Sequence, residues 1–239
     1  MADPLVFSDL YGANGLGFLV GDTQSASETD RKRIANDAYV ELAGIKGWWR
    51  KRTGTYTSSS SPALTAAINI YTVPSDFDSP YRLYYREAGG FIDVPFISDS
   101  EWLERSATRS TDSGDPAFAR LVHDGSNIRI ELDKPVSQQF IDRIGTLTLE
   151  YWIRITRLSG DSDAPILPAN LRHHIVPVAG LKYAKAQGDQ VLIESLKEDA
   201  LKAREAVMRH DLTRTGRARQ IRPRGRYYPQ SSSIGRDYQ

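Results

Sequence analysis

The sequence predicts an α+β fold in which a helical bundle, made of one N-terminal and two C-terminal helices, flanks a large and mainly antiparallel β section. Apolar residues recur every three or four positions up to about Thr53, alternate with polar residues as far as Leu158, and return to helical spacing after Pro165. Turn residues become dense in the alternating part. We therefore expect an extended N-terminal arm (1–26), a helical domain (27–52 and 165–210), an inserted β domain (53–164) and a basic C-terminal arm (211–239).

The N-terminal part combines this arm with an amphipathic helix. The arm is rich in glycine and short polar side chains, which predicts little regular structure. Ser25 and Ser27 are each expected to cap a helix over 28–46, because acidic residues three positions later complete a capping-box pattern. Gly44 or Gly47 is expected to end the helix. Its apolar stripe consists of Ile34, Ala38, Leu42 and Ile45.

The β section is predicted from alternating side chains and from turn chemistry. The segment 146–157 alternates most regularly, and its apolar face consists of Leu147, Leu149, Tyr151, Ile153 and Ile155. Two strands, 119–122 and Asn127–Leu132, are expected to form a hairpin around Asp124 and Gly125. Further strands are predicted over 67–73 and 81–86, a short helix over 99–105 around Trp102, and a loop over 106–116.

Two helices are predicted after Pro165. Pro168 suits the first turn of one of them, and Pro177 should kink or split it because proline lacks a backbone donor. Its apolar stripe consists of Leu171, Ile175, Val178 and Leu181. The second helix is predicted over 189–210, with an apolar face of Ile193, Leu196, Ala200, Ala203 and Val207. Glu198 with Lys202 and Glu205 with Arg209 are expected to pair on its solvent side.

Charge is strongly segregated along the chain. The formal net charge is only +1, but residues 209–239 hold eight arginines against two aspartates, so the rest of the chain is acidic. The basic segment has almost no aliphatic side chains, and we expect it to be ordered only against a partner. Such an arm suits an acidic surface of protein or nucleic acid. Arginine forks and tyrosine rings are the usual anchors of protein interfaces, and the same composition would also grip phosphates.

The sequence predicts no catalytic, cofactor or metal site. It contains no nucleophile elbow, and the glycines of the N-terminal arm miss the spacing of a phosphate-binding loop. His173 and His174 are adjacent, so on a helix they diverge too far to share one metal ion. The chain has no cysteine and no long apolar run, and we therefore expect a soluble protein made in the cytoplasm, without membrane contact.

The Trp48-Trp49 pair admits two interpretations. Followed by Arg50, Lys51 and Arg52, it could stack on nucleic-acid bases. A tryptophan pair at the end of an amphipathic helix more often closes a core, and basic residues border it because a helix C-terminus favours positive charge. We expect the second arrangement.

Five motifs between residues 34 and 190 follow one another in a recognisable order. They are IANDAYVELAGIKGWWRKRTGTYT, INIYTVPSDFDSPYRLYY, SDSEWLER, LTLEYWIRIT and APILPANLRHHIVPVAGLKYAKAQGDQ. This run resembles the head-to-tail adaptor, or connector, proteins of tailed bacteriophages. The resemblance covers about two thirds of the chain.

The resemblance implies a structural protein of the virion, not an enzyme. Adaptors of this kind form a homo-oligomeric ring, commonly of about twelve copies, under the portal vertex. The helical part would make the ring wall, the β part would face the next tail component (a stopper, nozzle or tail tube), and double-stranded DNA would pass through the lumen. The C-terminal arm would dock on the portal protein through Arg214, Arg217, Arg219, Arg222, Arg224, Arg226, Tyr227, Tyr228, Arg236 and Tyr238.

Two other functions fit parts of the sequence. A nucleic-acid-binding protein would place the arginine-rich arm on RNA or DNA. A virion-associated cell-wall hydrolase would need a pair of carboxylates across a cleft, and Glu101 and Glu104 are candidates on one short predicted helix.

Overall fold

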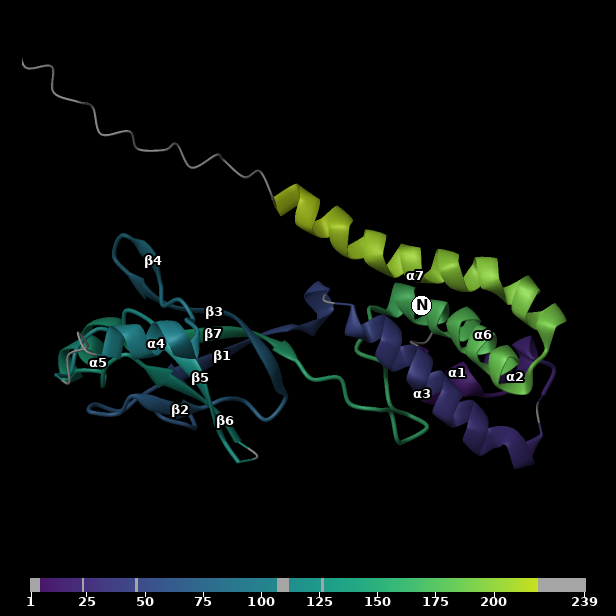
Figure 1. The fold of residues 1–239 in the computed structure, drawn as a ribbon, viewed down its shortest axis with the longest axis horizontal. Coiled ribbons are helices and arrows are strands. Elements are labelled where there is room, and N and C mark those ends of the chain that lie inside the picture. Colours follow the sequence, from purple (N-terminus) through teal and green to yellow (C-terminus); the bar gives the residue numbers. More distant parts are fainter. Residues whose placement is uncertain (1–4, 23, 46, 107–111, 126, 219–239) are drawn as a thin grey trace, which may run out of the picture.

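The computed structural model describes residues 5–22, 24–45, 47–106, 112–125 and 127–218, and the side chains of this part up to residue 210 apart from Ser25 and Ser106. It has two lobes joined side by side (Figure 1). The helical lobe contains both the first and the last described elements, and the β lobe lies between them in sequence. The predicted α+β class, with a β section between N-terminal and C-terminal helices, is confirmed.

The helical lobe is built around three long helices. Its α-helices are α1 (Phe7–Tyr11), α2 (Leu16–Leu19), α3 (Glu28–Gly44), α6 (Ile175–Gln187) and α7 (Gln190–Ala218), with short 3-10 turns at Ser25–Ser27 and Ala169–His174. One apolar core joins them, and α6 lies between α3 and α7.

The prediction of an N-terminal arm with little regular structure is wrong for the described part of that segment. Phe7, Leu10 and Leu16 are almost fully buried in the core of the helical lobe, on α1 and α2. The burial of these three large side chains offsets the conformational cost of ordering a glycine-rich segment. Glycine content alone therefore gave a wrong prediction.

Helix α3 matches the prediction, but its N-terminus is capped differently. The helix spans Glu28–Gly44, and its predicted apolar residues up to Leu42 are buried. The Ser27 side chain makes no capping bond to the helix backbone. Its hydroxyl instead donates to Asp22 at 2.7 Å, so the predicted capping box at Ser27 is replaced by a contact with the preceding loop.

Pro177 splits the predicted helix after Pro165. A 3-10 turn over Ala169–His174 precedes α6, which begins two residues before Pro177. At this position the missing N–H falls in the first turn, where α-helical donors have no intrahelical partner. Helix α6 ends at Gly188, which adopts a left-handed conformation with a φ of 73°.

Helix α7 is longer than predicted. It continues through residue 218 instead of ending at His210, so the backbone at Arg214 and Arg217 is helical. Asp189 accepts a hydrogen bond from the Leu192 amide at 3.0 Å and so caps its N-terminus. The expected pairs of Glu198 with Lys202 and Glu205 with Arg209 are confirmed at 2.7 and 2.9 Å.

The β lobe packs two antiparallel sheets around a second core. One sheet has the strand order β1 (Lys51–Thr57), β7 (Thr146–Ile153), β3 (Phe77–Glu87), β4 (Gly90–Asp93), and the other has the order β2 (Ile70–Thr72), β6 (Asn127–Leu132), β5 (Ala119–Asp124). Two short helices, α4 (Asp99–Ser106) and α5 (Gln138–Ile144), complete the lobe. The core side chains include Leu83, Tyr85, Ile130, Phe140, Leu147 and Leu149.

The predicted strands differ from the observed ones mainly at their ends. The β5–β6 hairpin around Asp124 and the short helix around Trp102 are confirmed. Strand β7 ends at Ile153, because the chain then turns away and Ile155 packs against the helical core. Strand β2 covers only three residues of the predicted 67–73, and Ala67 has a positive φ. Strands β1 and β4 and helix α5 were not predicted, and residues 107–111 of the predicted loop lie outside the described part.

Candidate assembly surfaces

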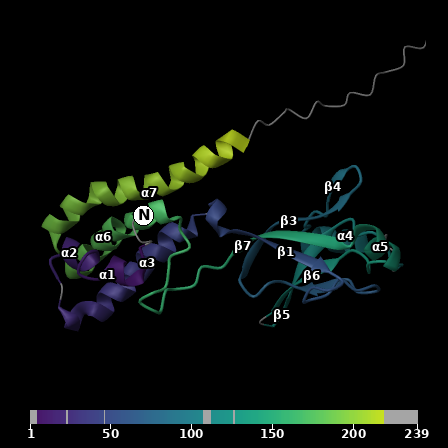
Figure 2. The same cartoon turned by 180° about the vertical axis from the view of Figure 1, so that it is seen from behind.

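The predicted docking residues come after the part of α7 whose side chains the structure describes. Among those side chains, Val207 is the last one of α7 in the helical core. Arg214 and Arg217 lie on the helical backbone beyond it, and their side chains are outside the described part. The other eight predicted docking residues, from Arg219 to Tyr238, also lie outside it. The end of α7 comes to the side of the helical lobe next to the β lobe (Figures 1 and 2).

Glu41 fixes α7 to the other two long helices. Its carboxylate accepts from Arg204 of α7 at 2.6 Å and pairs with Lys182 of α6 at 2.8 Å. Partial burial raises the pKa of Glu41, but hydrogen bonds from Arg204 and Lys182 outweigh this and leave the pKa below its usual value. The part of α7 that precedes the C-terminal segment is therefore held by a carboxylate that remains ionised at neutral pH.

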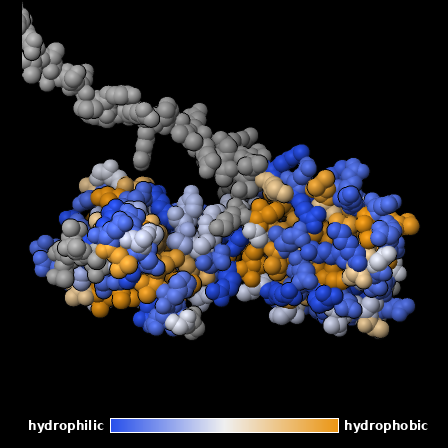
Figure 3. Space-filling model, viewed as in Figure 1, coloured by the Kyte–Doolittle hydropathy of each residue, from blue (hydrophilic) through white to orange (hydrophobic). Residues whose placement is uncertain are grey.

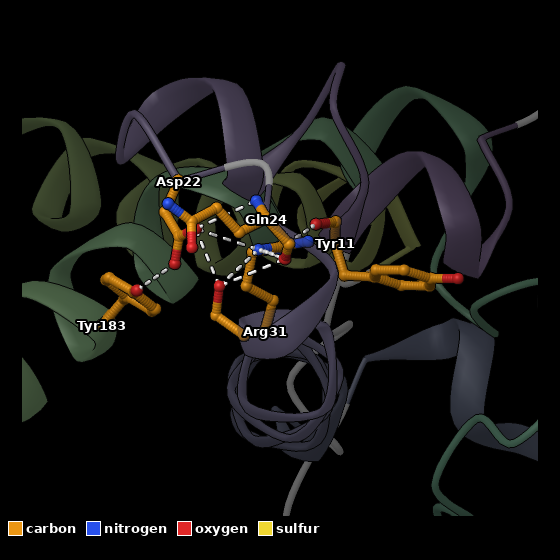
Figure 4. Close-up of polar contacts among 6 residues, drawn as sticks. Tyr11, Asp22, Gln24, Arg31 and Tyr183 are labelled. Atoms are coloured by element: carbon orange, nitrogen blue, oxygen red, sulfur yellow. Dashed lines mark hydrogen bonds and ion pairs between the residues drawn. The ribbon is translucent and has the colours of Figure 1, made fainter.

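A polar network beneath the N-terminal segment is centred on Arg31 (Figure 4). Arg31 lies on α3 and is almost fully buried. Its guanidinium donates to the backbone oxygens of Tyr11 at 3.3 Å and Gln24 at 2.9 Å, and lies 3.4 Å from the Asp22 carboxylate. A buried arginine is tolerated when its donors find partners in this way.

Asp22 links the same network to α6. The Tyr183 hydroxyl donates to its carboxylate at 2.6 Å. The hydrogen bonds from Ser27 and Tyr183 lower the pKa of Asp22, and the Asp22 contact raises the pKa of Tyr183. The loop between α2 and α3 is therefore tied to two of the long helices.

Arg50 connects the two lobes. It follows the Trp pair, in a 3-10 turn (Trp48–Arg50), and its side chain is buried. One guanidinium nitrogen donates to the Gly44 carbonyl at the end of α3 at 3.0 Å. Others donate to the Ile153 carbonyl at the end of β7, at 2.8 and 3.2 Å, and to Asp78 of β3 at 3.0 Å. One side chain thus fixes the last turn of a helix to the ends of two strands.

The segment from β7 back to the helices is tied to α3. The Asn36 side chain both donates to and accepts from the backbone of Leu158, at 2.9 and 2.8 Å. Asp161 accepts from the Tyr11 hydroxyl at 2.8 Å and pairs with Lys32 at 3.2 Å. These contacts join three segments that are far apart in sequence.

The Trp48-Trp49 pair belongs to the core, as expected. Trp49 is buried in the helical core, and Trp48 packs against it at the edge. The two rings meet edge to face, 6.2 Å apart between centroids. The hydrogen bond from Arg50 to Gly44 places a cation at the C-terminus of α3, which agrees with the interpretation of the following basic residues.

The residues considered for chemistry are not assembled into a catalytic arrangement in the described part. The His173 and His174 rings lie with centroids 3.9 Å apart and planes tilted by 42°, and burial together with His173 lowers the pKa of His174. Glu101 pairs with Arg105 on the exposed helix α4, and Glu104 is exposed on the same helix. No cluster of three metal-ligating side chains occurs among the described residues.

A groove of about 490 Å³ lies between β1 and the β2–β3 connection. It is lined by Gly54, Thr55, Tyr56, Ser61, Pro62, Thr72, Val73, Pro74 and Ser75. This lining contains hydroxyl and apolar groups but no carboxylate, so it lacks the acid pair that a glycoside hydrolase requires.

Sequence reasoning missed the polar residues that hold the helical lobe together. Arg31 and Asn36 lie among the buried residues of α3. Polar residues on the buried face of a helix are the signal that could have indicated them. Their partners, Tyr11, Gln24 and Leu158, lie in segments without a periodic pattern. The pairing therefore depends on the tertiary fold.

Comparison with known families identifies the chain. In the described part, no helix is both long and apolar enough to cross a membrane. A comparison with curated proteins gave no match. The family model described as SU10 adaptor protein matches residues 15–230, which include the helices from α2 onward, the whole β lobe and the first part of the basic segment. The chain therefore belongs to the SU10 adaptor protein family and is a structural adaptor of a phage virion.

Proposed function

We propose that this adaptor acts at the head-to-tail interface of a tailed phage. About twelve copies form a ring under the portal, which extends the DNA channel toward the next tail component. The C-terminal arm docks each copy on the portal protein through the ten arginine and tyrosine residues from Arg214 to Tyr238. The protein assembles in the host cytoplasm and remains in the virion.

The proposal rests on the family match and on how far along the chain this match extends. The match continues past the end of α7 and takes in residues up to 230, so the basic segment is largely part of the family's pattern. The segment has about six net positive charges, whereas the rest of the chain is acidic. A partner with acidic grooves would attract the basic arm and would repel the acidic remainder of the chain.

The physical mechanism is multivalent attachment. Residues 219–239, if extended, would span about 70 Å, which is enough to reach well beyond the helical lobe. Each arm needs only weak affinity, because a ring presents all its arms to a symmetric portal at high effective concentration. The net negative charge of the chain outside the basic segment suits a channel through which DNA must slide without binding.

The proposal is tested by cosedimentation with isolated portal rings of the same phage. The full-length chain should bind in moderate salt, and a chain that ends at Ala218 should bind at least about a hundredfold more weakly. A full-length variant with Arg222, Arg224 and Arg226 changed to Lys keeps the charge. It should still lose affinity if the arginines make bidentate contacts.

Other outcomes would count against the proposal in different ways. Equal binding by the full-length and shortened chains would move the docking site away from the arm. No binding to portals, combined with tight and salt-sensitive binding of the arm to DNA or RNA, would replace the head-to-tail role with a nucleic-acid-binding one.

A further inference from the structure

The outer face of the four-stranded sheet carries a cluster of aromatic and basic side chains. Side chains alternate along a strand, so the residues next to the buried Leu83, Tyr85 and Tyr151 point away from the core. A register shift of β3 between Pro80 and Arg82 brings Tyr81 to the same side. The aromatic–basic face, as we name it, consists of Lys51, Tyr81, Arg82, Tyr84, Arg86, Phe91 and Trp152. No described element covers its rings fully, and Tyr81 and Phe91 are 54% and 60% exposed.

Contacts within the face hold its rings in place. Lys51 lies 3.8 Å above the centre of the Tyr81 ring, which meets Trp152 edge to face at 5.7 Å. Phe91 meets Tyr84 edge to face at 5.3 Å. Such rings are already ordered before a partner arrives, so binding there loses little side-chain entropy.

The charges of the face favour a protein partner. Lys51 pairs with Glu150 at 2.6 Å, and Arg82 pairs with Asp93. Arg86 contacts the Phe91 ring at 5.8 Å and has no ion-pair partner among the described residues. One uncompensated cation beside exposed aromatic rings is too little charge for a phosphate backbone. It suits a protein surface that offers one carboxylate and an apolar side chain.

The face borders an open sheet edge. Strand β4 pairs only with β3 in the described part, and all four of its residues are exposed. Phe91 and Ile92 both lie on this edge strand. In Figure 1 the β3–β4 hairpin projects from the lobe, so a second molecule can reach it. An exposed apolar edge strand is normally protected, and a partner is one means of protecting it.

A complementary surface occurs on the same chain. On helix α4, Leu103 is 68% exposed and Glu104 is its exposed neighbour, while Trp102 is buried against the lobe. Glu104 has no ion-pair partner among the described side chains. Figure 3 shows apolar side chains among hydrophilic ones over the part of the β lobe where α4 lies. The helix therefore offers the carboxylate and apolar side chain that Arg86 and Phe91 would accept.

The two surfaces lie on opposite sides of the β lobe. Helix α4 is toward the viewer in Figure 1, whereas β7 and β1 of the four-stranded sheet are toward the viewer in Figure 2. Different patches on opposite sides of one molecule produce a heterologous contact, which can repeat from copy to copy and close into a ring.

We propose that the aromatic–basic face of one copy binds helix α4 of a second copy. Leu103 packs on Phe91, and Glu104 pairs with Arg86, which is the cross-strand neighbour of Phe91. This inference rests on the proposed ring for its setting, and it adds a contact between β lobes to the helical wall that the sequence predicted.

The absence of cysteine from the chain makes the contact directly testable. Phe91→Cys and Leu103→Cys, made in separate chains, introduce the only thiols. When the two variants are mixed, bound to portal rings and oxidised, a disulfide-linked dimer should form, because the proposed contact brings these positions within bonding range. Each variant alone should not cross-link. A Val191→Cys chain, which is 81% exposed at that residue on the helical lobe, is the matched control and should not cross-link with Phe91→Cys.

Charge reversal provides an independent measurement. Arg86→Glu and Glu104→Arg should each weaken self-association by roughly tenfold in sedimentation velocity, because each places like charges at every contact. The double variant Arg86→Glu/Glu104→Arg should recover most of the loss. Recovery is not expected from a variant that merely unfolds the β lobe.

The outcomes separate this inference from the proposed function. Rings that form on portals without the Phe91–Leu103 cross-link would overturn the β-lobe contact and leave the head-to-tail role intact. Normal self-association of Arg86→Glu would also overturn it. If that variant failed to bind the next tail component, the face would be assigned to that protein. If it failed to bind DNA, the face would be assigned to nucleic acid. A chain that stays monomeric at every concentration and does not bind portals would overturn both proposals.

Discussion

At the scale of single residues, the carboxylate of Asp22 anchors the α2–α3 loop to two long helices. It accepts hydrogen bonds from the Ser27 and Tyr183 hydroxyls and from the Gln24 amide, and it lies beside the buried Arg31. These contacts stabilise the ionised carboxylate, and they hold the α2–α3 loop against α6. The loop is thus anchored by one ionised group.

The lowered pKa of Asp22 predicts how stability depends on pH. A carboxylate whose pKa is lower in the folded state contributes stability above its unfolded value of about 4, and this is lost as pH falls through the folded pKa. Asp22→Asn should therefore be less stable than the wild type at pH 7, and the difference should shrink below about pH 4. Urea unfolding midpoints measured from pH 7 to 3 check this.

Asp30→Asn is the matched control for that measurement. Asp30 lies on the exposed side of α3, 3.5 Å from Arg33. Its substitution should leave the unfolding midpoint nearly unchanged across the same pH range. A constant gap between Asp22→Asn and wild type down to pH 3 would mean that the Asp22 contacts do not depend on its charge.

At the scale of elements, the turn between α6 and α7 is set by Gly188. Its φ of 73° is in the left-handed region, and no atom lies within 4 Å of where a Cβ would stand. Gly188→Ala should therefore destabilise the protein by about 1 kcal/mol through backbone conformation alone. Gly89→Ala, in similarly open space without a positive φ, should change the free energy of unfolding by less than about half of that. Equal effects in urea unfolding would rule out the conformational explanation.

The long elements were predictable because their burial is periodic. Helix α3, the β5–β6 hairpin and the division at Pro177 follow from apolar spacing, turn residues and proline chemistry, which act over a few neighbours. Short elements were missed where they depend on distant partners. Phe7 and Leu10 form α1 because the core of the helical lobe covers them, and strand β1 forms because β7 offers a partner edge. Local sequence contains neither cause.

The assembly surfaces were predictable only in part for the same reason. Composition indicates the basic arm, since charge is counted along the chain. The aromatic–basic face is invisible at that level, because Lys51, Arg86 and Trp152 come from three separate strands and meet only in the antiparallel register. The register had to be known before the surface could be recognised.

At the scale of the whole molecule, Arg50 is the main side chain joining the two lobes. Its removal would leave the Ile153 carbonyl without its guanidinium donor at a buried position and would also remove the donor to the Gly44 carbonyl at the end of α3. We expect Arg50→Ala to lower the free energy of unfolding by about 2–3 kcal/mol. Urea unfolding followed by tryptophan fluorescence measures this, because Trp48 and Trp49 lie beside the junction.

The neighbouring Arg52→Ala is the control for the junction. Arg52 is exposed and donates only to nearby backbone oxygens. The change should alter the free energy of unfolding by less than about 0.5 kcal/mol. If both substitutions cost the same, Arg50 is not the residue that holds the lobes together.

The division of the helical lobe into two distant stretches of chain determines the order in which the protein can fold during synthesis. Both sheets of the β lobe can form once Ile153 has left the ribosome, because neither contains a later residue. Helix α3 must wait, because its packing partners α6 and α7 lie more than a hundred residues downstream, as the contact of Glu41 with Arg204 illustrates. Until then its apolar stripe remains open to chaperones or to other nascent chains. The first long helix made is thus among the last elements to be buried.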